Sequence, residues 1–254
     1  EALRDAVVQA SADDTPETGL TIVDIGEDAL AEIGEWPWPR ARLADLVETL
    51  LGDYGARAVA LDVVLPEPAD ASGDARLASL AAHAPLVLAQ VFDYAPRATP
   101  LAQGVLARAA GPATPGHGVR AHGYIANHAA LAAAPCVGNI GYTPDLDGVL
   151  RRIPLATVYA GHRYAHLAPT LLDCTPGNPT APALASTDTT RIAGGDAFWR
   201  VPYRRAQAAY TVISAADVLR LRAPAPLLEG RYVLVGSSAL GLGDRVSTPL
   251  AALS

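Results

Sequence analysis

Apolar and polar positions follow two patterns along the chain, one typical of buried strands and one typical of amphipathic helices. Residues 20–25 and 58–65 are short, largely apolar runs with several β-branched side chains, as in strands that are covered on both faces. Between them, residues 40–54 place leucine or valine at i, i+3, i+4, i+7 and i+8, which predicts a helix. The pattern then predicts a helix over 74–83 and a strand over 86–92.

This order of elements predicts the fold class. A strand, helix, strand, helix, strand series favours a mostly parallel sheet, because parallel neighbours are joined by crossover helices. We therefore expect an α/β fold with a mostly parallel central sheet and helices on both faces. A leading helix is predicted over 1–12 and a last strand over 232–236. One α/β domain is expected over 20–250, because no long or charged linker divides it.

The second half of the chain predicts β-hairpins added to this sheet. Two pairs of extended runs flank turns rich in Asp and Gly, which is typical of hairpins. The pairs are 137–142 with 149–159, and 191–193 with 198–203. Two further helices are expected, over 164–173 and from an N-cap at Ser214 to about 222. Residues 93–123 are rich in Pro, Gly and Ala and indicate only a helix over 101–110.

Composition and charge exclude several classes of protein. The chain has 254 residues, of which 50% are hydrophobic and 18% charged, so it can bury a sizeable core and is not disordered. Its 26 acidic and 19 basic side chains give a net charge of -7, and the arginines are scattered. We therefore expect no nucleic-acid partner. No run reaches the ~18 apolar residues that a membrane-spanning helix needs.

Cysteine and histidine spacing predicts no metal site. Cys136 and Cys174 do not have the spacing of a metal-ligand pair, and they form either a disulfide or two separate buried thiols. The histidines lack a His-Glu-x-x-His motif and are expected on the surface or in loops.

Two carboxylates end predicted parallel strands. Asp24 and Asp62 each stand near the carboxyl end of a strand, which is the edge where open α/β sheets bind ligands. They are candidate site residues, and a hydrolase could use the same pair for general acid-base chemistry. The alternative is a structural role, in which they cap neighbouring helices or pair with Arg40.

A segment of alternating tryptophan and proline precedes the predicted helix over 40–54. Trp36, Trp38 and Arg40 would be held in fixed positions by the stiff prolines between them, so they are candidate ligand contacts. The alternative is a lid in which both tryptophans seal the edge of the sheet.

Two loops could bind ions or ligands. Residues 145–148 resemble the start of a calcium loop, but the later ligands are missing, so a turn is expected. Residues 237–249, with Ser237 and Asp244, are rich in Gly and Ser and could cradle an anion after the last strand. The chain has neither a GxGxxG motif nor a lysine, and this loop has no Gly-x-Ser-x-Gly motif. Nucleotide hydrolysis and a serine hydrolase are therefore not expected, and no cofactor is.

Six dispersed segments together resemble one family, the CHASE-two (CHASE2) domain, which is the second type of cyclase/histidine-kinase-associated sensory extracellular domain. The segments occur in the order that the family has, from about residue 20 to residue 250. They are 23–25, 33–40, 55–63, 145–155, 213–219 and 228–250.

The resemblance implies a sensor rather than an enzyme. Members belong to bacterial transmembrane receptors, with the sensor outside the cytoplasmic membrane and a cyclase, kinase or diguanylate cyclase output inside. Residues 1–12 would then be a membrane-proximal helix, and flanking membrane helices would join it. Because such outputs usually work as dimers, the resemblance also suggests a homodimer.

No catalytic residue set comes with the resemblance. Eight candidate residues match motif positions, although motif membership could reflect folding as readily as binding. With Ser237, the predicted ligand-binding residues are Asp24, Trp36, Trp38, Arg40, Asp62, Asp147, Arg151, Ser237 and Asp244.

The leading hypothesis is thus a periplasmic input domain that binds a small molecule, or responds to a partner, at the carboxyl edge of its sheet. One alternative is a periplasmic α/β hydrolase-like enzyme that uses Asp24 and Asp62. The other is a protein-interaction sensor, whose partner would meet exposed tryptophans at 36 and 38.

Overall fold

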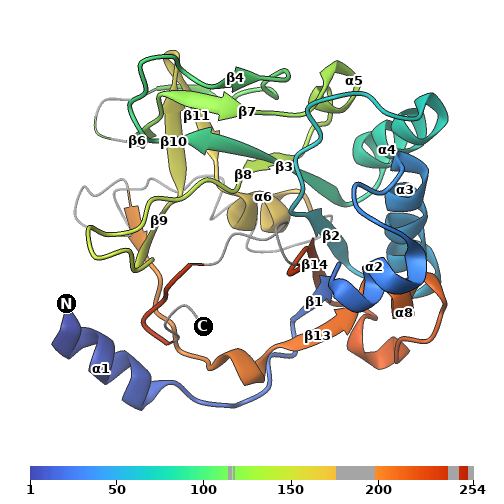
Figure 1. Cartoon of the computed structure of the whole chain (residues 1–254), viewed down its shortest axis with the longest axis horizontal. Coiled ribbons are helices and arrows are strands. Elements are labelled where there is room, and N and C mark those ends of the chain that lie inside the picture. The colour runs from blue at the N-terminus through green and yellow to red at the C-terminus, as the bar shows by residue number, and fades with distance from the viewer. Residues whose placement is uncertain (114–115, 117, 176–197, 240–245, 251–254) are drawn as a thin grey trace.

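A computed structural model describes residues 1–113, 116, 118–175, 198–239 and 246–250 (Figure 1). In this part of the chain, the main sheet has eight strands in the order β13-β1-β14-β2-β3-β7-β4, with β8 also paired to β3. Their bounds are β1 (Leu20–Asp24), β2 (Ala58–Leu61), β3 (Leu86–Asp93), β4 (Ala102–Gln103), β7 (Gly123–Ile125), β8 (Val137–Asn139), β13 (Thr211–Ser214) and β14 (Tyr232–Gly236).

The main sheet is mostly parallel, which confirms the predicted α/β class. The strands β13, β1, β14, β2, β3 and β8 all pair in parallel. At one end of the sheet, β7 pairs antiparallel with β3, and β4 pairs in parallel with β7. The register places Val23 opposite Val235 and Leu234 opposite Ala60, so the first and last predicted strands meet in the middle of the sheet. Their carboxyl ends therefore lie at one edge, as expected for Asp24 and Asp62.

Helices cover both faces of the sheet, as predicted. Alternate strand residues such as Val59 and Leu61 point into a large core that is shared with five helices. The residues between them, such as Ala58 and Ala60, point to the other face of the sheet and pack against α6 (Leu167–Asp173). The five helices are α2 (Glu27–Ile33), α3 (Arg40–Glu48, continued by a π-helical turn over Thr49–Asp53), α4 (Ala71–His83), α5 (Ala129–Ala132) and α8 (Ala215–Leu219).

One aspartate fixes the start of two of these helices. The Asp70 carboxylate accepts hydrogen bonds from the N–H of Arg40 at 2.6 Å and Ala41 at 3.2 Å, in the first turn of α3. It also accepts from the N–H of Gly73 at 3.0 Å, as the N-cap of α4. A Cβ at Gly73 would lie 2.2 Å from the Ala41 nitrogen, so only glycine allows this close approach.

The cysteines form a disulfide between Cys136 and Cys174, which decides between the two alternatives left open by the sequence. The bond joins the segment before β8 to the end of α6, and so holds α6 against the sheet. Helix α6 also packs closely on the middle of β8, because a Cβ at Gly138 would lie 2.4 Å from the Leu167 Cα atom.

A second, four-stranded sheet stacks beside the main one, in the order β5-β11-β10-β6. An added β-hairpin is present here, but it joins β10 to β11 through the turn at Ala160 and Gly161. The bounds are β5 (Gly111–Pro112), β6 (Val119–Arg120), β10 (Ala156–Tyr159) and β11 (His162–Ala165). A separate pair is formed by β9 (Arg152–Pro154) and β12 (Phe198–Arg200), and 3-10 turns lie at Gln207–Ala209 and Ala225–Leu227.

Several predicted elements differ from the structure. The hairpin of 137–142 with 149–159 is wrong, because β8 instead joins the main sheet in parallel with β3. The helix over 101–110 is wrong, since β4 begins there, and the helix over 164–173 starts only at Leu167 because Tyr164 belongs to β11. Residues 191–193 lie outside the described residues, and β12 pairs with β9.

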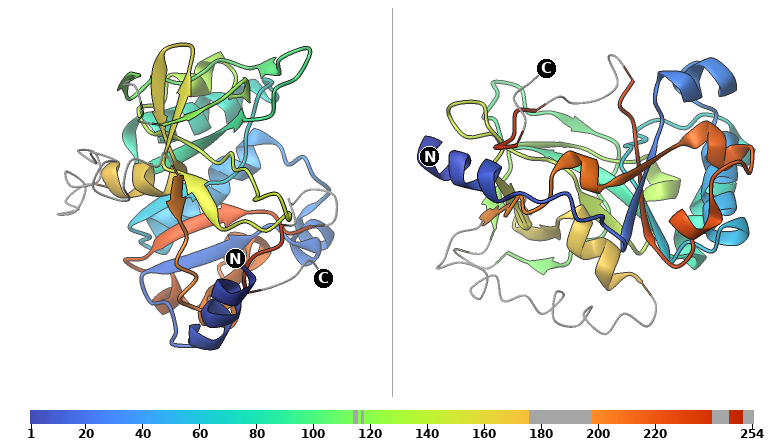
Figure 2. Two further views of the ribbon diagram at one scale, coloured as in Figure 1. Left: turned by 90° about the vertical axis from the view of Figure 1, so that its left-hand side faces the viewer. Right: turned by 90° about the horizontal axis from the view of Figure 1, so that it is seen from below.

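The leading helix α1 (Ala2–Ser11) forms as predicted and stands apart from the core. Figures 1 and 2 show it at the end of the molecule remote from α3 and α4. None of its residues is buried. Searched over the described ranges, the chain has no helix with the length and apolar character needed to cross a membrane. The membrane-proximal role of residues 1–12 and the single domain over 20–250 stay predictions.

Candidate functional site

A pocket of about 680 Å³ lies between α6 and the sheet, and we call it the α6-face pocket. Its sheet wall is formed by β1, β14 and β2, and its α6 wall by Leu167, Ala168 and Leu171. Segments around Trp36, Tyr142 and Leu150 close its sides. The pocket reaches the carboxyl edge of the parallel strands, where Asp62 and Ser237 follow β2 and β14. This edge is the usual ligand position in an open α/β sheet.

Small and branched apolar side chains make most of the wall. Ala60 and Leu234 come from neighbouring strands, and Leu20 from the start of β1. Alanine on β2 leaves space that a larger residue would fill, since α6 packs against this same strand. Four polar side chains interrupt the apolar wall, and they are Asp62, Tyr142, His166 and Ser237. A largely apolar cavity with few polar groups is typical of small-molecule sites.

His166 contributes a neutral donor to the pocket. Its Nδ1 atom accepts a hydrogen bond at 3.3 Å from the N–H of Ala168, as the N-cap of α6. A ring nitrogen that accepts carries no proton, so the proton of the neutral ring is on Nε2. Burial lowers the pKa of His166 from 6.5 to about 4, because desolvation disfavours the imidazolium. At neutral pH His166 is therefore an uncharged Nε2–H donor.

Ser237 contributes an acceptor, and the loop that holds it is tied to β1. The Ser237 hydroxyl donates to the Ile25 carbonyl at 2.8 Å, which leaves its oxygen free to accept from another donor. Ser238 donates to the Asp24 carboxylate from its N–H at 2.9 Å and from its hydroxyl at 2.5 Å. Asp24 thus anchors the loop and does not line the pocket.

The two tryptophans differ in position. Trp38 is only 2% exposed in the core, and its Nε1–H donates to the Gly34 carbonyl at 2.8 Å. Trp36 is half-buried and lines the α6-face pocket, with its ring centroid 6.1 Å from that of Trp38. Trp36 can therefore contact a ligand directly, whereas Trp38 supports it from behind.

Arg40 lies in a buried cluster away from the pocket. Its Nε atom is 3.5 Å from Asp74 Oδ1, and its Nη2 atom donates to the Glu67 carbonyl at 3.0 Å. His128 Nε2 lies 3.1 Å from the same Asp74 oxygen. The cluster joins the starts of α3, α4 and α5, so Arg40 has a structural role there. His128 lies in the loop before α5, as expected, although it is buried there, and His166 is half-buried between β11 and α6, where it lines the pocket.

Arg151 is enclosed by three carboxylates. Its Nη1 atom donates to Asp145 at 2.9 Å and to Asp147 at 2.8 Å, and its Nη2 atom donates to Asp147 and Asp5 at 2.7 Å each. The guanidinium is 4% exposed. These hydrogen bonds lower the pKa of Asp5, and they lower the pKa of Asp147 from 3.8 to about 2. Residues 145–148 form a turn, as predicted, closed by Gly148 N–H to the Asp145 carbonyl.

The structure therefore brings three predicted site residues to one pocket. These are Trp36, Asp62 and Ser237. Five of the others, Asp24, Trp38, Arg40, Asp147 and Arg151, lie elsewhere in contacts within the chain, and Asp244 lies outside the described residues. Sequence reasoning missed Tyr142 and His166. For His166 a signal was present, because it directly precedes an apolar helical run. No group of acidic, His or Cys residues suited to a metal occurs in the described ranges.

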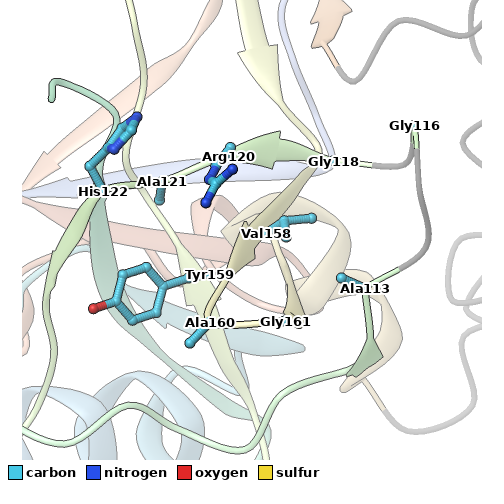
Figure 3. Close-up of a pocket in the computed structure, with 10 residues that line it drawn as sticks. All are labelled: Ala113, Gly116, Gly118, Arg120, Ala121, His122, Val158, Tyr159, Ala160 and Gly161. Atoms are coloured by element: carbon cyan, nitrogen blue, oxygen red, sulfur yellow. The ribbon is translucent and has the colours of Figure 1, made fainter.

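A second pocket of about 620 Å³ opens at the four-stranded sheet. Figure 3 shows Arg120 and His122 on one wall and Tyr159 with Ala160 on the other. Arg120 and His122 are exposed, and no sequence-predicted site residue lines this pocket. Its walls of Gly, Ala and exposed polar groups offer little apolar surface, so the α6-face pocket is the better candidate.

Comparison with known families agrees with the segments that the sequence singled out. The family described as the CHASE2 domain matches residues 1–254, the whole chain. The chain belongs to the CHASE2 domain family. CHASE2 domains are extracellular sensory domains of signalling receptors and are not catalytic. No curated protein and no solved structure matched this CHASE2 domain in the same comparison.

Proposed function

We propose that this CHASE2 domain is the ligand-sensing input domain of a bacterial transmembrane receptor, and that its stimulus is a small molecule bound in the α6-face pocket. The receptor would carry a nucleotide cyclase, kinase or diguanylate cyclase as its cytoplasmic output, with this domain on the periplasmic or extracellular face of the cytoplasmic membrane. The family supports the sensory role. The observation that carries the choice of site is the convergence of Trp36, Asp62 and Ser237 on one apolar pocket.

The polar groups of the pocket favour a ligand with an apolar body and a neutral polar head. His166 offers an N–H donor and Ser237 an acceptor, and a hydroxyl group, which both accepts and donates, matches either of them. A carboxylate head would lose hydration in a largely apolar cavity, which disfavours the charged form. An ammonium head could not accept from His166 and would lose hydration in an apolar cavity.

Three eight-carbon probes with different heads test this site. Amide chemical shifts of the labelled chain would be followed in titrations with 1-octanol, octanoate and octylammonium. We expect 1-octanol to shift residues that line the α6-face pocket with a Kd of about 1 mM or lower. The two charged probes should bind at least about fivefold more weakly, a difference of ~1 kcal/mol.

Two tryptophan variants separate the pocket from general apolar binding. Ala168→Trp places a large ring at an exposed position of the α6 wall and should weaken 1-octanol binding at least about tenfold. Ala75→Trp makes the same change at an exposed position of α4 outside the pocket and should leave binding unchanged. If no probe binds at the pocket, or if Ala168→Trp binds 1-octanol as the wild type does, the proposed site is wrong.

The structure gives the two alternatives less support. A hydrolase would need Asp24 and Asp62 at one reaction centre, but the Asp24 carboxylate accepts two hydrogen bonds from Ser238 and does not line the pocket. A protein-interaction sensor would need exposed tryptophans, but Trp38 is buried and Trp36 half-buried. The homodimer stays a prediction, which sedimentation of the chain would check.

A further inference from the structure

The helix α1 is attached to the domain by charged and polar groups rather than by an apolar face. None of its residues is buried, Leu3 and Val7 are 82% and 60% exposed, and only Val8 among its larger apolar side chains is half-buried. A helix of ten residues is marginal in water by itself. The polar contacts on its other side therefore determine whether α1 stays folded and docked.

The strongest of these contacts is with Arg151. Its Nε and Nη2 atoms donate to both Asp5 oxygens, at 2.7 to 3.2 Å, and its side chain is almost fully buried. The remaining contacts are more exposed. Arg200 pairs with Glu1, which is 44% exposed, and Gln9 Nε2 donates to the Pro249 carbonyl at 2.7 Å. A gap of about 150 Å³ remains beside Arg151 between α1 and residues 200–203. An enclosed, bidentate arginine–carboxylate pair is stronger than an exposed one.

Arg151 also lies directly beside the α6-face pocket in the chain. Leu150 and Ile153, on either side of it, both line that pocket. The segment is held at Leu150, whose carbonyl accepts from the Tyr203 hydroxyl at 2.5 Å and whose N–H donates to the Ser247 carbonyl at 2.8 Å. Because Leu150 directly precedes Arg151, a shift of Leu150 in the pocket would also move the backbone of Arg151.

We propose that Arg151 is a latch that couples the α6-face pocket to α1, so that a ligand pressing on Leu150 and Ile153 changes how firmly α1 is docked. The inference rests on the proposed function, because it takes the pocket as the stimulus site. The guanidinium fork matches its carboxylates at short, directed distances, so a displacement of about 1 Å is enough to weaken the Asp5 pairs. Asp145 and Asp147 still accept hydrogen bonds from Arg151 when Asp5 leaves.

Coupling between two sites is reciprocal and can be measured from either end. Hydrogen exchange of the amides of residues 5–12 reports the docking of α1, since these amides lose protection when the helix unfolds. Two independent changes perturb the pocket. One is the binding of 1-octanol, and the other is Ala168→Trp, whose larger side chain occupies part of the pocket. Ala75→Trp is the matched control for the second. The expected response to either perturbation is a change of about fivefold or more in the α1 exchange rate.

Two alanine variants of α1 show whether the response passes through Arg151. Asp5→Ala and Glu1→Ala each remove one acidic side chain from the start of the same helix, but only Asp5 contacts Arg151. In Asp5→Ala, the α1 amides should exchange faster and should no longer respond to Ala168→Trp or to 1-octanol. In Glu1→Ala, the response should remain.

The outcomes distinguish the latch from the ligand site. If the α1 exchange rate is the same in the wild type and in Ala168→Trp, or if the response persists in Asp5→Ala, the latch is wrong even where 1-octanol binds. If 1-octanol does not bind but Ala168→Trp still changes α1 exchange through Asp5, the latch stands and the proposed ligand class fails.

Discussion

Arg151 Nη2 donates to Asp5 Oδ2 at 2.7 Å, although the two residues are 146 positions apart in the chain. The contact joins the leading helix α1 to a turn whose next residues line the α6-face pocket. It places the element expected nearest the membrane within reach of the cavity expected to bind the stimulus. The geometry thus offers a short route between the proposed ligand site and α1.

Arg151 should stabilise the fold more than a surface arginine does, because it is buried among three carboxylates. Arg151→Met leaves three carboxylates near one another without a cation, and we expect a loss of about 5 °C or more in Tm. Arg97→Met removes an arginine that pairs with Asp93 at the surface, where the Arg97 side chain is 58% exposed. Its Tm should change by about 1 °C or less. Equal decreases of Tm in the two variants, measured by calorimetry, would contradict the claim that Arg151 stabilises the fold more than Arg97 does.

Acid should release α1 before the rest of the fold. The lowered pKa values of Asp5 and Asp147 mean that their paired state is fully present above the unfolded pKa of 3.8. The stabilisation is then lost as pH falls from about 4 towards the Asp147 pKa of about 2. Carboxyl titration by NMR, with α1 amides followed in the same samples, checks this window. Release of α1 above pH 5 would show that another group controls it.

His166 should make stability depend on pH in a higher range. Its pKa is about 4 in the folded protein and near 6.5 when exposed, so the unfolded chain binds the proton first on acidification. Stability is therefore full above pH 6.5 and falls by at most about 3 kcal/mol as the pH drops to 4. His166→Asn keeps an N-cap acceptor for α6 but does not titrate, so urea unfolding at pH 7 and pH 5 should lose this difference. An unchanged difference in the variant would assign the pH dependence to another group.

The disulfide should contribute strongly because it closes a long loop. Cys136 and Cys174 are 38 positions apart, for which the loss of chain entropy in the unfolded state corresponds to about 4 kcal/mol. We expect the double variant Cys136→Ala/Cys174→Ala to lose about this free energy of unfolding in urea titrations. The oxidised and the reduced wild type give the internal comparison. If reduction leaves the unfolding midpoint unchanged, the bond does not hold α6 on the sheet.

The central strands could be predicted because both of their faces are buried. Residues 58–61 and 232–235 read as unbroken apolar runs, and these are the strands with helices on each side. The pairing of β8 could not be predicted, because Val137 pairs with Leu88, which is about fifty residues away in the chain. The hairpin predicted over 137–159 was wrong for this reason. The helix α2 was missed because it has only seven residues, too few for its apolar positions Ala29, Leu30 and Ile33 to show a clear period.

The candidate site was predictable only in part for the same reason. Asp62 and Ser237 follow parallel strands, and their shared edge follows from the strand order. The assignment of Arg151 as a ligand contact, in contrast, stays a prediction with a competing explanation. Its partner Asp5 is so distant in sequence that no spacing could indicate the pair. The sequence did not indicate His166 as the cap of α6, because the predicted helix over 164–173 begins before it, whereas α6 begins at Leu167.

The most direct test of the account is hydrogen exchange over the whole chain with and without 1-octanol. We expect slower exchange where the pocket is lined, around residues 60–64, 166–171 and 234–237, together with an altered rate in α1. Changes confined to residues 118–122 and 158–161 would place the ligand in the other pocket. That result, or no change anywhere, would contradict the α6-face pocket as the sensory site.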